Sequence, residues 1–259
     1  MKIFILCGGF GTRLDHESKL IAKPMVRIGK EPILYHLIEN FYIQGFDEFV
    51  LCLGYKAESI INYFTKEKSK QSKILQKTKN HIKILFKHNK IKIKVSLIDT
   101  GIKSGTGGRI KIAYKTLKLD EDFLMTYGDG LSNISIKKLI KFHYKNKSLV
   151  TMTAVKPKQR YGILKIKKNR VNFFDNSKKK VEVYINGGFH VIDKLSLKYI
   201  KNKKIFWEKE PISKILKINK LYAFKHDGFW KSLDTQKDKV DFNKMYKQKK
   251  INWRFKKLK

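Results

Sequence analysis

A glycine-rich turn near the start of the chain is the first place where residue types and spacing suggest chemistry. The apolar run that begins at Ile3 ends in Gly8-Gly9-Phe10-Gly11-Thr12-Arg13, and Lys23 follows further on. Glycines at the end of a buried strand let main-chain N–H groups face a phosphate, because no Cβ obstructs the approach. Arg13 and Lys23 add the positive charge that a triphosphate requires. The segment therefore predicts a phosphate-binding turn.

The same turn differs from two common nucleotide-binding motifs. It is not a Walker loop, since no Gly-Lys-Ser/Thr follows it, and it is not a dinucleotide fingerprint, since Leu14 stands where the third glycine belongs. Together with Thr12-Arg13 and the downstream Lys23-Pro24, the turn indicates a functional phosphate site outside these two classes.

Two aspartates that lie far apart in the sequence are candidates for a metal site. Asp129 follows the apolar run 123–127 between two glycines, and Asp234 follows Leu233. In an α/β sheet the position of Asp129 is the carboxyl end of a strand, where ligands bind. Proteins usually hold Mg²⁺ with one or two carboxylates plus substrate phosphates. From the residues alone, a turn aspartate at 129 and a helix N-cap at 234 are the simpler interpretations.

Alternating strand and helix patterns must position these groups. Strands are predicted at 3–7, 49–53, 91–98, 123–127 and 149–155, and helices after Pro32, around 60–64, after Gly108 and at 136–143. Strands that alternate with helices at this spacing imply βαβ units and a mostly parallel sheet. Between them, residues 66–90 form a lysine-rich excursion with one expected strand, 82–86.

The second part of the chain has a different pattern, with shorter strands. Strands are predicted at 162–167, 171–174 and 188–192, and helices at 211–218 and 240–245. The last residues, 247–259, are basic and are expected to fray. There is no internal repeat and no long linker.

The composition indicates a globular protein with an unusual charge. The 259 residues carry a formal net charge of +37, which raises the question of nucleic-acid binding. However, only six of the 59 basic residues are arginines, whose bidentate fork usually reads bases and phosphates, and the lysines are spread over most segments. We therefore expect weak, nonspecific adhesion to polyanions and no specific nucleic-acid partner.

The cysteines and the apolar runs bear on the compartment. The two cysteines, Cys7 and Cys52, lie in or at the end of apolar runs and are expected to be small buried side chains of a reduced protein. No apolar run is long enough to span a bilayer, and the N-terminal run is too short for a signal peptide. The expected location is the cytoplasm, without a membrane partner.

Several motifs, in order along the chain, resemble a known family. Gly11-Thr12-Arg13-Leu14, Lys23-Pro24-Met25-Val26 and Pro32-Ile33-Leu34 resemble the nucleotidyltransferase superfamily of sugar-nucleotide pyrophosphorylases. Later motifs resemble its glucose-1-phosphate cytidylyltransferase branch: Asp99-Thr100-Gly101, Thr106-Gly107-Gly108-Arg109, Thr126-Tyr127-Gly128-Asp129-Gly130, Ile185-Asn186-Gly187-Gly188-Phe189, Trp207-Glu208 with Glu210-Pro211, and Gly228-Phe229-Trp230 with Asp234-Thr235. The resemblance covers roughly residues 1 to 250.

The resemblance implies a fold and a reaction. The fold is α/β, a Rossmann-like nucleotidyltransferase fold with a central mixed, mostly parallel sheet and a smaller acceptor-binding region. The domain would span 1–235, with a nucleotide-binding half at 1–150 and a sugar-phosphate-binding half at 151–235, followed by a basic helix or tail at 236–259. In the implied reaction, an oxygen of a sugar 1-phosphate attacks the α-phosphorus of CTP and pyrophosphate leaves. No covalent enzyme intermediate is needed.

The resemblance also assigns residues to the nucleotide and the metal. Arg13, Lys23 and Asp129 would be catalytic, and Asp129 and Asp234 would hold Mg²⁺. Arg109 and the backbone of 104–109 would meet the cytosine edge, although a plain helix N-terminus is the alternative for this loop. The full set of implied nucleotide-binding residues is Leu6, Gly8, Gly9, Phe10, Gly11, Thr12, Arg13, Lys23, Ser104, Thr106, Gly107, Arg109 and Gly128.

The acceptor site is less clearly marked than the nucleotide site. The resemblance assigns the sugar phosphate to Tyr161, Gly162, Asn186, Gly187, Trp207 and Glu208, for which ordinary turns and core aromatics are the alternative. Where the family reads Glu-Lys-Pro after the strand that ends at Phe174, this chain has Asn176-Ser177-Lys178. The expected acceptor is α-D-glucose 1-phosphate, with another sugar or polyol phosphate as the alternative.

A different class of function is also open, a non-catalytic protein that binds nucleotides or polyanions. The joint presence of Arg13, Lys23, Asp129 and Asp234 argues against it, because a binding protein needs no two-carboxylate metal site. The resemblance further suggests a homo-oligomer.

Overall fold

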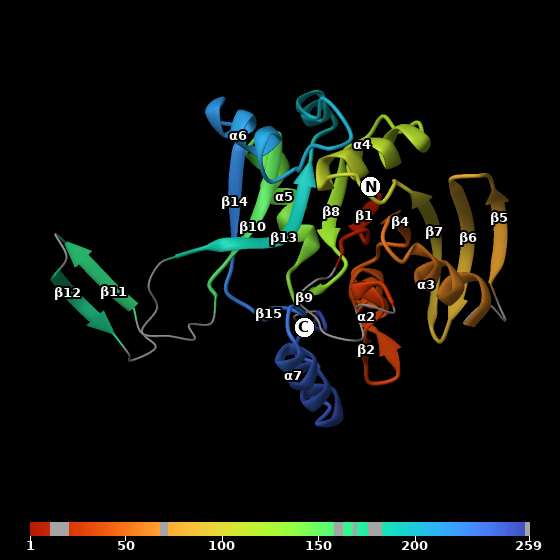
Figure 1. Ribbon diagram of the computed structural model, residues 1–259, viewed down its shortest axis with the longest axis horizontal. Coiled ribbons are helices and arrows are strands. Elements are labelled where there is room, and N and C mark those ends of the chain that lie inside the picture. Colours follow the sequence, from red (N-terminus) through yellow and green to blue (C-terminus); the bar gives the residue numbers. More distant parts are fainter. Residues whose placement is uncertain (11–20, 68–71, 158–162, 168–169, 176–182, 257–259) are drawn as a thin grey trace.

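A computed structural model describes residues 1–10, 21–67, 72–157, 163–167, 170–175 and 183–256. Within them, nine strands form one sheet in the order β14-β10-β13-β8-β1-β4-β7-β6-β5 (Figure 1). Only β6 and β13 run against the direction of the other seven strands. The expected α/β class with a mixed, mostly parallel sheet is therefore confirmed.

The strands of this sheet come from the whole length of the chain. They are β1 (Ile3–Leu6), β4 (Glu48–Leu53), β5 (Lys73–Lys77), β6 (His81–His88), β7 (Ile91–Asp99), β8 (Phe123–Tyr127), β10 (Val150–Val155), β13 (Ile185–Ile192) and β14 (Leu221–His226). Three two-stranded sheets accompany it: β2 (Arg27–Ile28) with β3 (Glu31–Pro32), β9 (Gly130–Ser132) with β15 (Trp230–Ser232), and β11 (Ile163–Lys167) with β12 (Arg170–Asp175). The β11–β12 pair stands apart from the main sheet at the far left of Figure 1.

Helices cover both faces of the large sheet. They are α2 (Ile33–Ile43), α3 (Ala57–Asn62), α4 (Thr106–Thr116), α5 (Ile136–Lys145), α6 (Glu210–Lys217) and α7 (Gln236–Lys247), with 3-10 turns η1 (Lys23–Met25) and η3 (Lys194–Tyr199) and a π turn η2 (Tyr63–Glu67). Among the described residues, no helix combines the length and apolar character that crossing a membrane requires.

The alternation of side chains along β1 explains the two cores. Ile3 and Ile5 face one side and pack with α2, α5 and α7, whereas Phe4 and Leu6 face the other side and pack with α4 and α6. All four side chains are buried, as expected for a central strand with helices on both sides. The carboxyl end of β1 is thereby fixed in the middle of the sheet, where the glycine turn begins.

Several elements differ from the sequence expectations. Strand β5 lies in the lysine-rich excursion and was not predicted, because its five residues are all exposed and carry no burial pattern. Strand β14 was also missed, since none of its six residues is fully buried. The chain end does not fray up to residue 256: Trp253 is fully buried in the core beside Phe242 of α7. Cys7 and Cys52 are buried free thiols, as predicted.

The division expected at residue 150 does not coincide with a break in the large sheet. Strands β10, β13 and β14 all follow this point, and they extend the sheet beyond β8. The two functional halves therefore share one sheet, and their assignment to nucleotide and acceptor remains a prediction.

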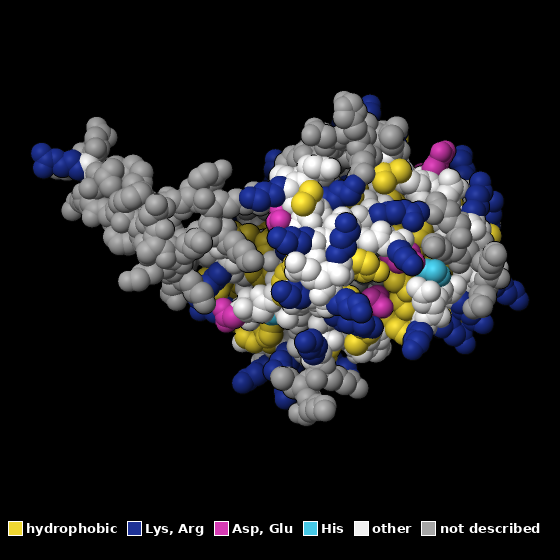
Figure 2. Space-filling view, turned by 90° about the horizontal axis from the view of Figure 1, so that it is seen from below, with side chains coloured by type: hydrophobic (Ala, Val, Ile, Leu, Met, Phe, Trp, Pro, Cys, Tyr) yellow, Lys and Arg dark blue, Asp and Glu magenta, His cyan; other side chains and the backbone are white. Residues whose placement is uncertain are grey.

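The positive charge is dispersed over the surface. On the face shown in Figure 2, lysine and arginine side chains alternate with uncharged areas and do not gather in one stripe. This distribution suits the expectation of weak, nonspecific adhesion to polyanions.

Candidate active site

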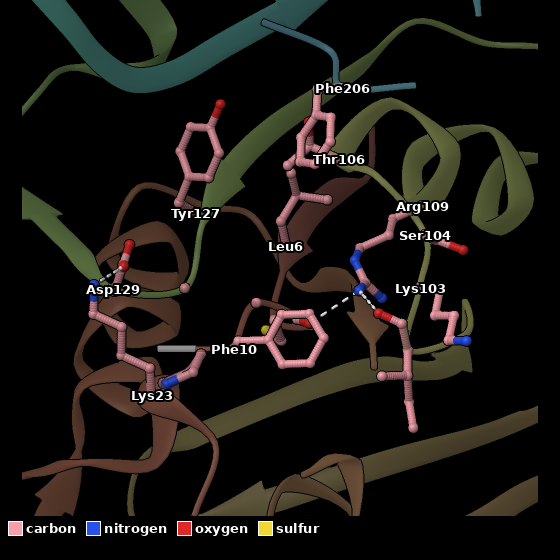
Figure 3. A pocket seen from close by; sticks show the side chains of 16 residues that line it. Leu6, Phe10, Lys23, Lys103, Ser104, Thr106, Arg109, Tyr127, Asp129 and Phe206 are labelled. Atoms are coloured by element: carbon pink, nitrogen blue, oxygen red, sulfur yellow. Dashed lines mark hydrogen bonds and ion pairs between the residues drawn. The ribbon is translucent and has the colours of Figure 1, made fainter. Parts of the chain in front are cut away.

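A cavity of about 470 Å³ opens at the carboxyl ends of β1 and β8 (Figure 3). Its lining includes ten residues that the sequence assigned to the nucleotide or metal: Leu6, Gly8, Gly9, Phe10, Lys23, Ser104, Thr106, Arg109, Gly128 and Asp129. Gly107 lies in the first turn of α4 and does not line the cavity. Gly11, Thr12 and Arg13 lie outside the described residues.

Lys23 joins the two aspartates that the sequence assigned to a metal. Its Nζ lies 2.6 Å from Oδ2 of Asp129 and 2.9 Å from Oδ1 of Asp234. Burial lowers the pKa of Lys23, but the charges and hydrogen bonds of the two carboxylates outweigh it, so the net shift of the pKa is upward. The ammonium is therefore charged and holds both carboxylates at one point.

Strand pairing explains how residues so distant in sequence meet. The antiparallel pair β9–β15 places Ser232 opposite Gly130, and the N–H of Leu233 donates to the carbonyl of Asp129 at 2.8 Å. Ser232 Oγ also donates to Oδ2 of Asp234 at 2.5 Å. Asp234 is not the cap of α7, because Thr235 and Asp238 form the capping box there. Asp234 is therefore not a helix N-cap, and its side chain lies beside Lys23 and Asp129.

The donor set suits a Mg²⁺ ion that arrives with phosphates. Two carboxylates converge on one cation, the Lys23 ammonium, so the geometry already accommodates positive charge between them. The described residues contain no group of three or more His, Cys, Asp or Glu side chains that could hold a metal. The protein would supply Asp129 and Asp234 and leave the remaining positions to phosphate oxygens and water, as is usual for Mg²⁺.

Arg109 has a different environment from the one expected for a base-reading arginine. Its Nη1 donates to the carbonyls of Leu53 and Gly101 and to Thr100 Oγ1, and its Nη2 donates to the carbonyls of Gly8 and Ile102. The residue is only 4% exposed, and burial lowers the pKa of its guanidinium. Both Nη atoms are thus engaged by protein acceptors. The geometry favours a positioning role, in which Arg109 ties the glycine turn to the loop after β7.

The glycines around the start of α4 are required by close packing. A Cβ at Gly105 would overlap the carbonyl of Ile205, and one at Gly108 would overlap the carbonyl of Lys203. The N–H groups of these two glycines donate to Lys203 and Ile205 at 2.9 and 3.1 Å. The segment 203–207 therefore lies directly against the N-terminus of α4.

Glu208 connects this region to the strand that carries Asp129. Thr106 Oγ1 donates to its Oε2 at 2.6 Å, and the hydroxyl of Tyr127 donates to its Oε1. Burial, followed by the charge and hydrogen bond of Glu208, raises the pKa of Tyr127, so the phenol stays protonated. Glu208 thus contacts two residues that line the cavity, and its role toward the acceptor remains a prediction.

A buried histidine links two other predicted acceptor residues. Nε1 of Trp207 donates to Nδ1 of His190 at 3.2 Å, which leaves Nε2 to donate to Oδ1 of Asn186 at 2.9 Å. The Trp207 side chain is fully buried in the core, and the assignment of this residue to the acceptor remains a prediction. Gly187 accepts from Trp230 Nε1 at 2.7 Å. Tyr161 and Gly162 lie outside the described residues.

Comparison with known proteins decides the family. The sequence model of the nucleotidyl transferase family matches residues 2–249. This chain belongs to the nucleotidyl transferase family.

Individual relatives of this nucleotidyl transferase cover nearly its whole length. Glucose-1-phosphate cytidylyltransferase from Salmonella typhimurium is 38% identical over 98% of this chain and 99% of its own. A probable glucose-1-phosphate cytidylyltransferase from Bacillus subtilis is 35% identical over the same shares. The crystal structure of HddC from Yersinia pseudotuberculosis with GMP-PN superimposes with a TM-score of 0.68 at 26% identity, covering 95% of this chain and 99% of HddC. The expected nucleotidyltransferase fold is thereby confirmed.

Six residues that line the nucleotidyl transferase cavity were not assigned to the site from the sequence: Cys7, Pro24, Ile102, Lys103, Tyr127 and Phe206. Ile102 and Phe206 line it with half-exposed apolar side chains, 54% and 49% exposed, and Lys103 lies beside them. Ile102 and Lys103 follow the Asp99-Thr100-Gly101 motif, and Phe206 directly precedes Trp207-Glu208. Proximity to these motifs was the available signal, but nothing in the sequence shows which neighbours of a motif face a cavity.

Proposed function

We propose that this chain transfers CMP from CTP to α-D-glucose 1-phosphate, giving CDP-glucose and pyrophosphate. The observation that carries the proposal is the 38% identity, over 98% of the chain, with a glucose-1-phosphate cytidylyltransferase. The convergence of Lys23, Asp129 and Asp234 at the nucleotide cavity supports it, since two neighbouring carboxylates could hold the Mg²⁺ that neutralises phosphate charge.

The reaction is an in-line displacement at the α-phosphorus of CTP. An ionised phosphate oxygen of glucose 1-phosphate forms the new bond, and the bond from the α-phosphorus to the bridging oxygen of the β-phosphate breaks. The electron pair leaves with pyrophosphate. The attacking oxygen carries no proton at neutral pH, so no general base is required. This explains why the cavity needs no nucleophilic serine or activated histidine, and why positioning and charge neutralisation dominate.

The residues of the cavity divide this work. The N–H groups at Gly8 and Gly9, which line the cavity, would bind phosphate oxygens, and Lys23 would neutralise charge on the triphosphate. Asp129 and Asp234 would hold Mg²⁺, which supplies charge neutralisation on phosphate oxygens when bound. Lys23 bridges both carboxylates, and its ammonium would turn to the phosphate oxygens of a bound nucleotide. Arg13 would act beside Lys23, as the family resemblance implies.

A guanylyl transfer is the second candidate, and one observation favours it. HddC, which has the same fold at 26% identity, was solved with GMP-PN. The cytidylyltransferase relatives share more sequence over as much of the chain, so CTP is preferred here.

The acceptor is tested through the segment that departs from the family. Residues 176–178 lie outside the described residues. Wild-type protein should form product from CTP with glucose 1-phosphate faster than with a panel of other sugar and polyol phosphates, and only with Mg²⁺. If the double variant Asn176→Glu, Ser177→Lys gains ten-fold or more in kcat/KM on glucose 1-phosphate, the wild type is specialised for another acceptor.

Two further expectations belong to this proposal. We expect a homo-oligomer that acts in the cytoplasm, in line with the family resemblance. Size-exclusion chromatography with light scattering would measure the oligomeric state directly.

A further inference from the structure

The segment 203–207 is held rigidly against the start of α4. Its carbonyls at Lys203 and Ile205 accept from the N–H groups of Gly105 and Gly108, and the N–H of Trp207 donates to Thr106 Oγ1 at 2.8 Å. The absence of Cβ atoms at these glycines is what allows the approach. The Trp207 indole is buried and anchors the end of the segment to His190. Phe206 lies between these anchors.

Phe206 is anchored by its backbone, yet its ring is not buried. The side chain is 49% exposed and lines the nucleotide cavity. Lys209 Nζ lies 5.3 Å from the ring centroid and covers one side of the ring. A large apolar side chain that is fixed in place and half exposed at a cavity suits contact with an apolar part of a ligand.

One side of the cavity carries the ion pair of Lys23 and Asp129, and the Phe206 ring lies apart from it. This arrangement limits which part of a ligand the Phe206 ring can contact. Figure 3 shows Lys23 and Asp129 on one side, and Arg109, Ser104 and Lys103 on the other, with Phe206 above Leu6 and beside Thr106. Triphosphate and metal belong at the charged side. The apolar side chains of Leu6, Ile102 and Phe206 also line the cavity. They can pack against the planar part of the nucleotide, which is the base.

We propose that Phe206 is a base-binding residue, whose ring forms the apolar wall against which the nucleobase of the bound NTP packs. The glycines of the α4 N-terminus act indirectly, by allowing segment 203–207 to carry this ring into the cavity. A residue from the half of the chain expected to bind the acceptor thus contributes to nucleotide affinity. The identity of the base as cytosine rests on the proposed function; the role of Phe206 does not.

The test distinguishes binding of the base from binding of the phosphates. Isothermal titration calorimetry at one fixed Mg²⁺ concentration would measure CTP and inorganic tripolyphosphate binding to wild type, Phe206→Ala and Phe206→Tyr. Leu216→Ala is the matched control, because Leu216 of α6 is 58% exposed and does not line the cavity. Loss of an aromatic contact to a base should weaken CTP binding about ten-fold or more in Phe206→Ala. Tripolyphosphate binding should stay within two-fold, Phe206→Tyr should restore CTP affinity, and Leu216→Ala should behave as wild type.

Other outcomes overturn the proposal in recognisable ways. Equal weakening of CTP and tripolyphosphate would mean that the substitution disturbs the phosphate site. An unchanged CTP affinity with a raised KM for glucose 1-phosphate would place Phe206 at the acceptor. If wild-type protein prefers GTP or UTP, the proposed function fails, and the same variants then test Phe206 on the preferred nucleotide. If the wild type binds no NTP, both proposals fail.

Discussion

The two sides of the nucleotide cavity are built in different ways. On the charged side, Lys23, Asp129 and Asp234 meet through side-chain ion pairs, and each has a role that its residue type suggests. On the other side, Gly105, Gly108 and Arg109 serve the backbone around them, and Phe206 is one of the side chains that line the cavity.

Charged residues and glycines differ in how directly their motifs indicate a function. A charged residue usually acts through its own atoms, so its motif points directly at the chemistry. A glycine acts through whatever its missing Cβ allows to approach, and that partner is invisible in the sequence. The Thr106-Gly107-Gly108-Arg109 motif therefore marks the base side of the cavity without containing all the residues that contact a base.

The largest expected effect is on the charged side. Asp234→Asn should keep the fold, because the amide still accepts from Ser232, but it removes one of two carboxylates at the metal site. Loss of one electrostatic contact of this kind costs about 2.7–4 kcal/mol, on the order of 10²–10³ in kcat. Steady-state kinetics at saturating Mg²⁺ would measure it. Asp120→Asn, at a largely exposed aspartate, is the control, and near-wild-type turnover of Asp234→Asn would refute the metal assignment.

Arg109→Ala should mainly affect stability. The substitution removes the hydrogen bonds that the buried guanidinium donates to the carbonyls of Leu53 and Gly8, and losing a hydrogen bond to a charged group costs about 1.5–3 kcal/mol. Chemical denaturation should show a loss of about 3 kcal/mol, and the ratio of kcat/KM for CTP over UTP should change little. A stable variant that has lost its preference for CTP would instead make Arg109 a direct reader of the base.

Gly108→Ala should lower the stability of the protein, because it disturbs the packing of segment 203–207 against α4. Its Cβ would overlap the Lys203 carbonyl, and overpacking of this kind costs about 1–3 kcal/mol. The control is Gly130→Ala, where a Cβ meets nothing within 4 Å, and its stability should stay close to that of the wild type. Denaturation midpoints of the pair would decide the matter. Equal stability of both variants would contradict the tight approach of segment 203–207.

The smallest expected effect concerns acid stability at His190. Burial lowers the pKa of His190 to about 3, whereas the unfolded side chain titrates near 6.5. Between these values the unfolded state binds a proton that the native state does not, so stability falls as the pH falls from 6.5. His190→Gln should flatten this dependence, by about 1 kcal/mol between pH 6.5 and 5.5. Identical slopes for the two proteins would show that His190 is protonated in the native state.

The sequence predicted the sheet and the charged side better than the rest, for physical reasons. Buried strands such as 49–53 and 123–127 are continuous apolar runs, and Asp129 follows one of them directly. Strand β5 has no buried face, so no periodicity marks it. Trp253 packs beside Phe242, but the many basic residues around it in the sequence give no sign that it is buried. The role of Phe206 depends on the approach of 203–207 to α4, a contact between segments distant in sequence.

The proposed cytidylyl transfer is tested most directly by the product that forms from each nucleotide. Wild-type protein would be incubated with Mg²⁺, labelled glucose 1-phosphate and, separately, CTP, GTP, UTP or dTTP, and the sugar nucleotides would be separated by anion-exchange chromatography. We expect CDP-glucose in amounts equal to the pyrophosphate released, with the highest kcat/KM for CTP and no product without Mg²⁺. Faster formation of GDP-glucose or UDP-glucose, or no sugar nucleotide from any of the four, would contradict the proposed transfer.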